Sequence, residues 1–241
     1  MSAIAALLVH ECDRDRDLVS IPRAEIQVVV RMGAVARGGL DIHALGAHQT
    51  IRRKRIRGGQ RTIMARLGLD RAEAVLGVPA ATLAGRVVPL DQLWGDAETR
   101  RLVDRLGSTR TAITAAAILE RAIETRAPAA NANAHARLVL AAAERLAHAN
   151  VTDVADELGV SERHLRRVFR DVTGVSPKAF ARLARFHRAL SAGRAAQRAS
   201  WARIAVATGY YDQAHLIDEF RAIAGTTPRG LVDEILEPTA I

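Results

Sequence analysis

The chain has 241 residues, a formal net charge of +9 and a hydrophobic content of 49%. This length allows one large domain or two ordinary ones, and the hydrophobic content excludes a disordered chain. A single cysteine, Cys12, excludes an intramolecular disulfide and fits a reducing compartment. The apolar stretches fall far short of the roughly 20 residues that cross a membrane, and no signal-peptide pattern is present, so we expect a cytoplasmic protein.

The positive charge favours a polyanionic partner such as nucleic acid or an acidic membrane surface. It comes almost entirely from arginine, because Lys54 and Lys178 are the only lysines. The planar guanidinium suits phosphates and guanine edges, although GC-rich genomes also favour arginine and alanine.

Residues 1–69 are expected to form short strands and turns. Glycine-rich breaks separate runs that are apolar or that alternate between apolar and polar residues, which is typical of strands. These runs occupy residues 25–31, 40–45 and 60–67.

A densely basic run occupies residues 52–57 and is followed by Arg61. It could touch DNA or bind an acidic effector. If residues 51–57 form an edge strand, the charges would instead deter edge-to-edge aggregation.

From Asp70 the apolar spacing becomes helical. Pro79 can open a short helix, and Ser108 can cap a helix over residues 111–125, with another over 96–106 before it. We expect Trp94 to anchor the core of this part. The prediction is an α+β amino-terminal domain over 1–127, strand-rich over 1–69 and helical over 70–127.

Several side chains near the amino terminus are of types that bind metals, but their spacing is not that of a zinc site. We interpret the histidines as ordinary surface or core residues and predict no metal and no cofactor. Cys12 alone could act as a redox sensor or an alkylation acceptor. The side chains concerned are His10, Glu11, Cys12, Asp13, His43 and His48.

Small and polar residues over 128–134 predict a linker between two domains. Beyond it nearly every segment predicts helix, so we expect an all-α carboxy-terminal domain over 135–241. Between Val160 and Ile204, eleven basic residues stand against only Glu162 and Asp171. Such a run is often only a solvated helix face, but this one overlaps a repeated motif.

The carboxy-terminal region repeats itself at a period of about fifty residues. An alanine and a glycine recur 50 positions apart, and four further residues recur 51 positions apart, so the second copy has one extra residue in its turn. The recurring pairs are Ala155 and Ala205, Gly159 and Gly209, Leu165 and Leu216, Phe169 and Phe220, Gly174 and Gly225, and Pro177 and Pro228.

Each copy meets the requirements of a helix-turn-helix. Two helices that cross at close range need a small contact residue, and the tight turn needs a residue that tolerates positive φ. Ser161 and Asp212 stand where the second helices would have their N-caps. We predict helix-turn-helix units over 151–172 and 200–224, with a linking helix over 176–192. Their structural residues would be Ala155, Gly159, Leu165, Ala205, Gly209, Leu216 and Phe220.

The helical period turns the other side chains of each second helix outward, toward DNA. Arginine can read guanine and glutamine can read adenine, whereas Asp218 repels phosphate but could accept a hydrogen bond from cytosine N4. We therefore expect the first copy to dominate the affinity, and the second to contribute less or to read an unusual base pattern. Residues expected to read bases are Glu162, Arg163, Arg166 and Arg167 in the first copy, and Gln213, Ala214, Ile217 and Asp218 in the second. Residues expected to contact phosphates are Thr152, Arg170, Arg185, Ser200, Trp201 and Arg221.

Over about residues 135–235 the chain resembles the AraC/XylS-type transcription regulators. The similarity lies in VADELGVSERHLRRVFRDVTGVSPKAF, in FARLARFHRAL, and in IAVATGYYDQAHLIDEFRAIAGTTPRGL. It implies two helix-turn-helix units joined by a rigid helix, with recognition helices in successive major-groove turns about 34–36 Å apart. Members of the family often have a basic or hydroxyl residue where this chain has Ile217 and Asp218.

The amino-terminal region resembles that of one AraC-type subgroup, in GLDIHALGAHQ and LGVPAATLAGRVVPLDQLWG. This resemblance implies a domain that senses a small-molecule effector or forms a homodimer.

The sequence can be compared with three classes of function: an enzyme, an interaction or architectural protein, and a transcription regulator. An enzyme would need a convergent catalytic set, and the sequence has no glycine-rich phosphate loop, nucleophile elbow or credible metal cluster, so we predict no enzyme and no catalytic residues. A pure interaction or architectural protein would bind DNA without base preference, or not at all. We predict a sequence-specific transcription regulator that binds double-stranded DNA and has no membrane partner, with RNA polymerase, a small-molecule effector and a second copy of the chain as possible further partners.

Overall fold

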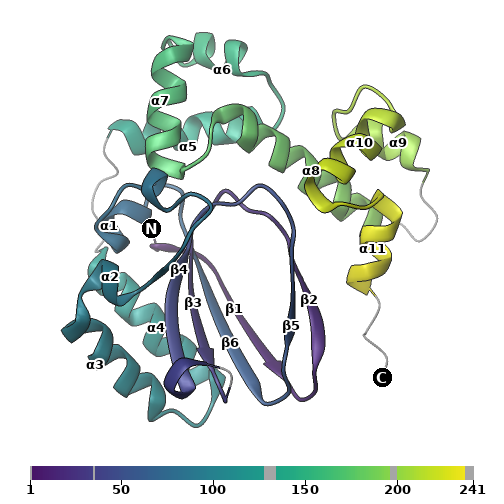
Figure 1. The fold of residues 1–241 in the computed structure, drawn as a ribbon. Coiled ribbons are helices and arrows are strands. Elements are labelled where there is room, and N and C mark those ends of the chain that lie inside the picture. Colours follow the sequence, from purple (N-terminus) through teal and green to yellow (C-terminus); the bar gives the residue numbers. More distant parts are fainter. Residues whose placement is uncertain (1, 35, 128–133, 196–199, 237–241) are drawn as a thin grey trace.

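The computed structural model describes residues 2–34, 36–127, 134–195 and 200–236 (Figure 1). In the first half six strands precede the α-helices, and a seventh strand lies among those helices; the second half is entirely helical where it is described. The expected two-domain class, α+β followed by all-α, is confirmed. The expected linker lies outside the described residues except for Ala134, which begins a helix.

A five-stranded antiparallel sheet forms the centre of the amino-terminal half. Its order is β1 (Ile4–Cys12), β6 (Gln60–Leu67), β3 (Gln27–Met32), β4 (Leu40–Leu45) and β7 (Val87–Pro89). The strands β2 (Arg16–Ser20) and β5 (Arg52–Ile56) pair separately as a two-stranded ribbon, here called the β2–β5 ribbon. The basic run is therefore a strand. The strands β1, β2 and β7 were not expected from the sequence, because their apolar and polar residues do not alternate clearly.

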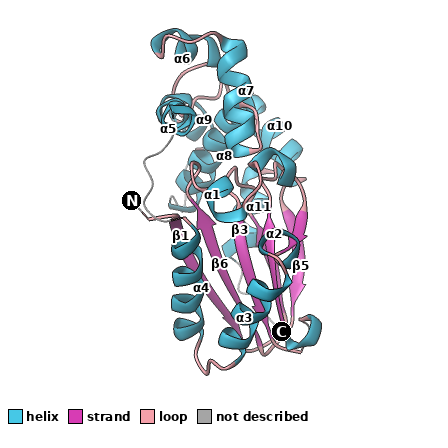
Figure 2. Cartoon of the chain, turned by 90° about the vertical axis from the view of Figure 1, so that its left-hand side faces the viewer, coloured by secondary structure: helices cyan, strands magenta, loops and turns pink. Residues whose placement is uncertain are grey.

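Helices cover one face of the sheet (Figure 2). They are α1 (Ala72–Leu76), α2 (Asp91–Trp94), α3 (Asp96–Gly107) and α4 (Ala112–Arg126), with short 3-10 helices η1 (Arg37–Gly39) and η2 (Ala80–Leu83). Alternate strand residues such as Val28, Val30 and Ile63 face these helices and are fully buried. Trp94 lies in the same core, as expected, and its indole nitrogen donates to the Val75 carbonyl at 2.9 Å.

The expected cap of α4 is wrong. Ser108 still belongs to the end of α3, because its backbone N–H donates to the Asp104 carbonyl at 3.2 Å. Thr111 has the extended backbone that an N-cap requires, and its hydroxyl accepts from the Thr114 N–H.

The carboxy-terminal half consists of α5 (Ala134–Leu146), α6 (Val151–Glu157), α7 (Glu162–Thr173), α8 (Pro177–Ala195), α9 (Trp201–Ala207), α10 (Gln213–Ala224) and α11 (Pro228–Leu236). We call α6 with α7 the first unit and α9 with α10 the second unit. Each unit has its own apolar cluster, one around Phe169 and the other around Phe186 and Phe220. No helix in the described part of the chain is long and apolar enough to cross a membrane.

The amino-terminal half touches the first unit. Ala24 and Ala47 join the apolar cluster of that unit, and α7 packs against η2 where Gly174 lies beside the Ala80 carbonyl. The His187 ring on α8 lies 2.7 Å from the Pro22 carbonyl oxygen.

The β2–β5 ribbon touches the second unit and α11. Val19 and Ile51 pack against the second apolar cluster, and the Ile51 N–H donates to the Ile223 carbonyl at 2.9 Å. Arg53 makes two hydrogen bonds to the Glu234 carboxylate, of 2.6 and 2.9 Å, and a third of 3.0 Å to the Ala224 carbonyl. Both helix-turn-helix units are therefore seated on the amino-terminal half.

Candidate DNA-binding site

The turns of the two units are built alike. Ala155 and Ala205 are buried where the helices cross, and Gly159 and Gly209 have φ of 66° and 87°. Only glycine adopts such angles without strain, which explains its recurrence at both turns.

The two recognition helices, α7 and α10, have side-chain caps. The Ser161 hydroxyl accepts from the His164 N–H at 3.2 Å, and the Asp212 carboxylate accepts from the His215 N–H at 2.8 Å. These are the residues expected from the sequence. The caps fix where each recognition helix begins and hence which side chains its first turns present.

The exposed face of α7 is strongly basic. Arg163, Arg166, Arg167 and Arg170 are all exposed, and the fully buried Leu165 lies on the opposite face. Arg167 is near the Asp171 carboxylate at 3.8 Å, a surface pair that leaves it free to exchange partners.

Glu162 joins the starts of α6 and α7. Its carboxylate accepts a hydrogen bond from the Thr152 hydroxyl and pairs with Arg166. These contacts, the Thr152 bond first, hold the pKa of Glu162 below its usual range. The structure thus brings together two expected base-reading residues and one expected phosphate-contacting residue.

The exposed face of α10 is less basic. Gln213, Ala214, Asp218 and Arg221 are exposed, and Arg221 lies 3.7 Å from the Asp218 carboxylate. Ile217 is half-buried and packs against the second apolar cluster, so only part of it faces outward.

The start of α9 differs from the start of α6. Ser200 precedes α9 but makes no side-chain cap, unlike Asn150, which caps α6. Trp201 packs against Phe220 and covers Gly193, where an added Cβ would come within 2.3 Å of the ring. The indole of Trp201 is therefore largely engaged in packing.

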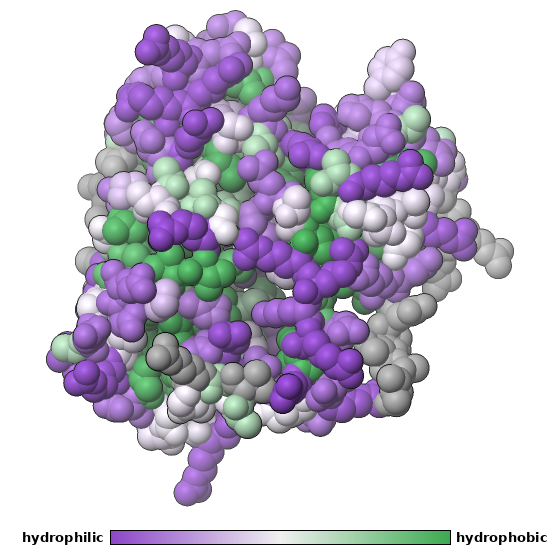
Figure 3. Space-filling model, in the orientation of Figure 1, coloured by the Kyte–Doolittle hydropathy of each residue, from purple (hydrophilic) through white to green (hydrophobic). Residues whose placement is uncertain are grey.

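A cleft of about 1220 Å³ separates the two units. In Figure 3 the units rise separately, covered mostly by hydrophilic side chains. Four cationic residues of α8 line the cleft, and of these only Arg185 was expected to contact DNA. They recur three or four positions apart, a spacing that puts them on one helix face and could have revealed them. They are Lys178, Arg182, Arg185 and Arg188.

Two features of the second unit were missed from the sequence. Tyr211 is 89% exposed immediately before the cap of α10, which makes it available to a partner. Glu219 is a charged residue on the packed side of α10, only 9% exposed.

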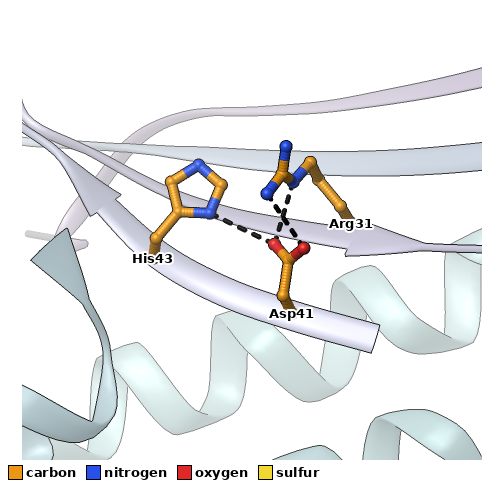
Figure 4. A network of polar contacts seen from close by, with 3 residues as sticks. All are labelled: Arg31, Asp41 and His43. Carbon is orange, nitrogen blue, oxygen red and sulfur yellow. Dashed lines mark hydrogen bonds and ion pairs between the residues drawn. The ribbon is translucent and has the colours of Figure 1, made fainter. Parts of the chain in front are cut away.

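A separate polar cluster lies in the amino-terminal half, on β3 and β4 (Figure 4). Arg31 makes paired hydrogen bonds of 2.8 and 2.9 Å to the Asp41 carboxylate, and His43 Nδ1 lies 3.3 Å from the same group. Burial, followed by the nearby Arg31 charge, lowers the pKa of His43. The three side chains border a hollow of about 590 Å³.

The expected metal-ligand types do not converge where the structure is described: no group of three or more histidine, cysteine, aspartate or glutamate side chains there could hold an ion. Cys12 is buried at the end of β1, with 5% of its surface exposed. Burial makes it a poor candidate for a reactive thiol.

Comparison with known proteins identifies the helical half. Residues 154–233 match the family described as a helix-turn-helix domain. The comparison with curated proteins gave no match. A DNA-binding transcriptional dual regulator from Escherichia coli is 26% identical over 41% of this chain and 94% of its own, with a TM-score of 0.34.

A second solved structure spans nearly the whole chain. ToxT from Vibrio cholerae, with an unsaturated fatty acid bound, is 9% identical over 96% of this chain and 95% of its own, with a TM-score of 0.48. The assignment rests on the family match together with the repeated turns, caps and exposed recognition helices described above. The carboxy-terminal half carries a helix-turn-helix domain of the AraC type, and this domain supports a DNA-binding transcription regulator.

Proposed function

We propose that the protein recognises a specific, asymmetric DNA site by placing α7 and α10 in successive major-groove turns of one DNA face. The observation that carries this proposal is the duplicated unit itself, with two capped and exposed recognition helices on either side of one continuous linking helix. Successive major-groove turns lie about 34–36 Å apart. One chain would then read a site about two helical turns long.

In this proposal, base readout comes from Glu162, Arg163, Arg166 and Arg167 on α7, and from Gln213, Ala214, Ile217 and Asp218 on α10. Phosphate contacts come from Thr152, Arg170, Arg185, Ser200, Trp201 and Arg221. The cleft adds Lys178, which is exposed on α8 between the units. Four exposed arginines against one favour the first unit as the main source of affinity.

Selection of binding sequences from a random DNA pool at about 0.15 M salt tests the proposal. We expect one asymmetric motif about two helical turns long. A single half-length motif would assign base readout to one unit alone. Recovery of no motif would reject a sequence-specific regulator in favour of non-specific DNA binding.

We further propose that residues 1–127 form a separate domain, joined through 128–134, that controls DNA binding in response to an effector or to dimerisation. The supporting observation is that this half touches both units, through η2 and through the β2–β5 ribbon. The hollow beside Arg31, Asp41 and His43 has the size of a small-molecule site. The contacts of η2 and of the β2–β5 ribbon hold the two units in place. A ligand, a second copy of the chain or RNA polymerase that changed these contacts would change how the units bind DNA.

Replacing Arg53 by alanine tests this control, because it removes the bonds to Glu234 and to the Ala224 carbonyl at the end of α10 without changing any residue of either recognition helix. We expect a changed affinity for the selected motif and an unchanged preference for its bases. An unaltered affinity would separate the amino-terminal half from DNA binding. Sedimentation equilibrium of the full chain tests dimerisation, which a monomer at micromolar concentration would reject.

A further inference from the structure

Glu219 occupies an unexpected place for a charged residue. It lies on α10 beside Phe220 and three positions after Leu216, both of which are fully buried, and it is itself only 9% exposed. Burying a carboxylate is costly unless other groups pair with it and satisfy its oxygens. The surroundings of Glu219 therefore need a specific explanation.

Three side chains satisfy the Glu219 carboxylate. Arg185 Nη2 lies 3.2 Å from Oε2, Arg182 Nε lies 3.4 Å from the same oxygen, and the Tyr210 hydroxyl donates to Oε1 at 2.9 Å. The Arg185 guanidinium also lies over the Tyr210 ring, 4.9 Å from its centre. One carboxylate thus ties the recognition helix α10 to the linking helix α8 and to the turn that precedes α10.

The first unit has no such network. Tyr210 lies 50 positions after Val160, and Glu219 lies 51 positions after Val168, so two valines hold the matching places. Val168 is fully buried and Val160 packs against the same apolar cluster. A helix-turn-helix therefore folds with an apolar pair here, and the ionic network of the second unit is not required by the fold.

The apolar pair of the first unit and the ionic network of the second differ in how strictly they fix the orientation of a helix. Apolar packing is non-directional and tolerates small rotations of a helix, whereas a carboxylate held by three donors on two elements has one favourable geometry. Buried ion pairs are weak contributors to stability, and their best-supported role is to specify a register. Arg188 on α8 adds to the same fixation by donating to the Thr208 carbonyl at 3.1 Å.

We propose that Glu219 is a positioning residue that fixes α10 against α8 and so sets the spacing between the two halves of the DNA site. This inference rests on the proposed tandem readout. A rigid pair of recognition helices accepts only one phase between its half-sites, because each added base pair turns the second half by about 34° around the DNA axis. The network, rather than the apolar cluster, supplies that rigidity.

The test uses the full chain and a double variant, Tyr210→Val with Glu219→Val, which recreates the apolar pair of the first unit. Each protein is titrated with the motif selected by the wild-type chain, and with versions that carry one inserted or one deleted base pair between the halves. We expect the wild-type chain to lose about tenfold or more in affinity on either change, the size of a lost base contact. The double variant should lose at most about twofold, because its second unit can turn to follow.

Two further variants keep the result interpretable. Glu219→Gln preserves the size of the side chain and removes its charge, and should give an intermediate spacing penalty even if the double variant fails to fold. Asp233→Asn removes an exposed carboxylate on α11, 4.0 Å from Arg229, and should keep the wild-type penalty. A general loss of stability would weaken binding at all spacings alike and would not change the ratio between them.

The outcomes separate this inference from the proposed function. A wild-type chain that selects only a half-length motif overturns tandem readout and this inference with it. The other outcome is that the wild-type chain has a strict spacing and that Glu219→Gln and the double variant keep the same spacing penalty. That result overturns the role of Glu219 and leaves tandem readout standing.

Discussion

The two helix-turn-helix units share a backbone and differ in what they carry on it. Their small, glycine and aromatic positions coincide, from Ala155 and Ala205 at the crossing to Phe169 and Phe220 in the core. Their recognition helices do not: α7 exposes a row of arginines, whereas α10 exposes Gln213, Asp218 and a single arginine. A few apolar and glycine positions therefore determine this fold, and the remaining positions are free to diverge toward different DNA contacts.

The units also rest differently on the amino-terminal half. The first is seated by close packing, with Gly174 against the Ala80 carbonyl. The second contacts the β2–β5 ribbon through the apolar packing of Val19 and Ile51 and, in addition, through polar contacts, above all those of Arg53 with Glu234. Variants at matched positions in the two units test whether these differences have energetic consequences.

The largest expected contrast is between Gly174→Ala and Gly225→Ala. Both glycines end a recognition helix with positive φ, of 81° and 72°. An added Cβ at Gly174 would come within 2.9 Å of the Ala80 carbonyl oxygen, whereas at Gly225 it would meet nothing within 4 Å. Denaturant unfolding should show a loss of about 1–2 kcal/mol for Gly225→Ala and about 2–4 kcal/mol for Gly174→Ala. Equal losses would mean that the first unit is not held by this contact.

DNA binding should also separate the units. Arg166→Ala should weaken binding by about 1–3 kcal/mol and relax the preference at one base pair of the selected motif. Arg221→Ala should weaken binding less, uniformly across sequences, and lower the salt dependence by about one phosphate contact. Competition binding with single-base variants of the motif measures both. A uniform loss for Arg166→Ala would make it a phosphate contact instead.

A fall in pH should weaken the contact between the amino-terminal half and the first unit. His48 is 4% exposed, and its backbone N–H donates to the Arg23 carbonyl at 3.1 Å, between the segments that carry Ala24 and Ala47. Burial, followed by the charge of Arg52, lowers the pKa of His48 from 6.5 to about 4. The folded state therefore binds the proton less readily than the unfolded state, so the stability present above pH 6.5 falls as the pH drops toward 4.

By about pH 5 this difference should cost about 2 kcal/mol of the free energy of unfolding. Urea unfolding at several pH values, with His48→Gln beside the wild type, measures the effect. The variant should show a shallower loss between neutral pH and about pH 5. Identical slopes would assign the pH dependence to other groups.

The smallest expected effects are those of the helix caps. Ser161→Ala and Asp212→Ala should each lower the stability by about 1 kcal/mol, because each leaves a backbone N–H of a recognition helix without its acceptor. Ser200→Ala should change little, since Ser200 makes no side-chain cap. Thermal unfolding of the three variants would show whether the two units depend equally on their caps.

The repeated positions explain how far the sequence could predict the helical half. Ala155, Gly159, Ser161 and their counterparts have local roles that a single sequence reveals. Glu219 was missed because a glutamate next to Asp218 looks like part of a solvated face, and only its alignment with the buried Val168 could have placed it inside. Its partners Arg182 and Arg185 lie more than thirty positions away, beyond the reach of local patterns.

The amino-terminal half was less predictable for the same reason. The strands β4 and β6 follow clear patterns, but β1 mixes half-buried and exposed residues along its length, because its edge position leaves one side unpaired. Ser108 was mistaken for the N-cap of α4 because a serine before an apolar run is a common sign of a helix start. In the structure Ser108 instead ends α3, and Thr111 caps α4. The contacts between the amino-terminal half and the two units depend on tertiary packing, and no local sequence pattern predicts them.

The seat of the second unit has a consequence for the order in which the molecule assembles. Arg53 and Glu234 are 181 positions apart, whereas the segment of Ala80 meets that of Gly174 after fewer than one hundred. Chains are synthesised from the amino terminus, and contacts between distant residues form slowly because long loops must close first. We therefore expect Val19 and Ile51 to stay uncovered until α11 has been synthesised. The first unit can dock before the second unit has been made, and the second can dock fully only once α11 is available.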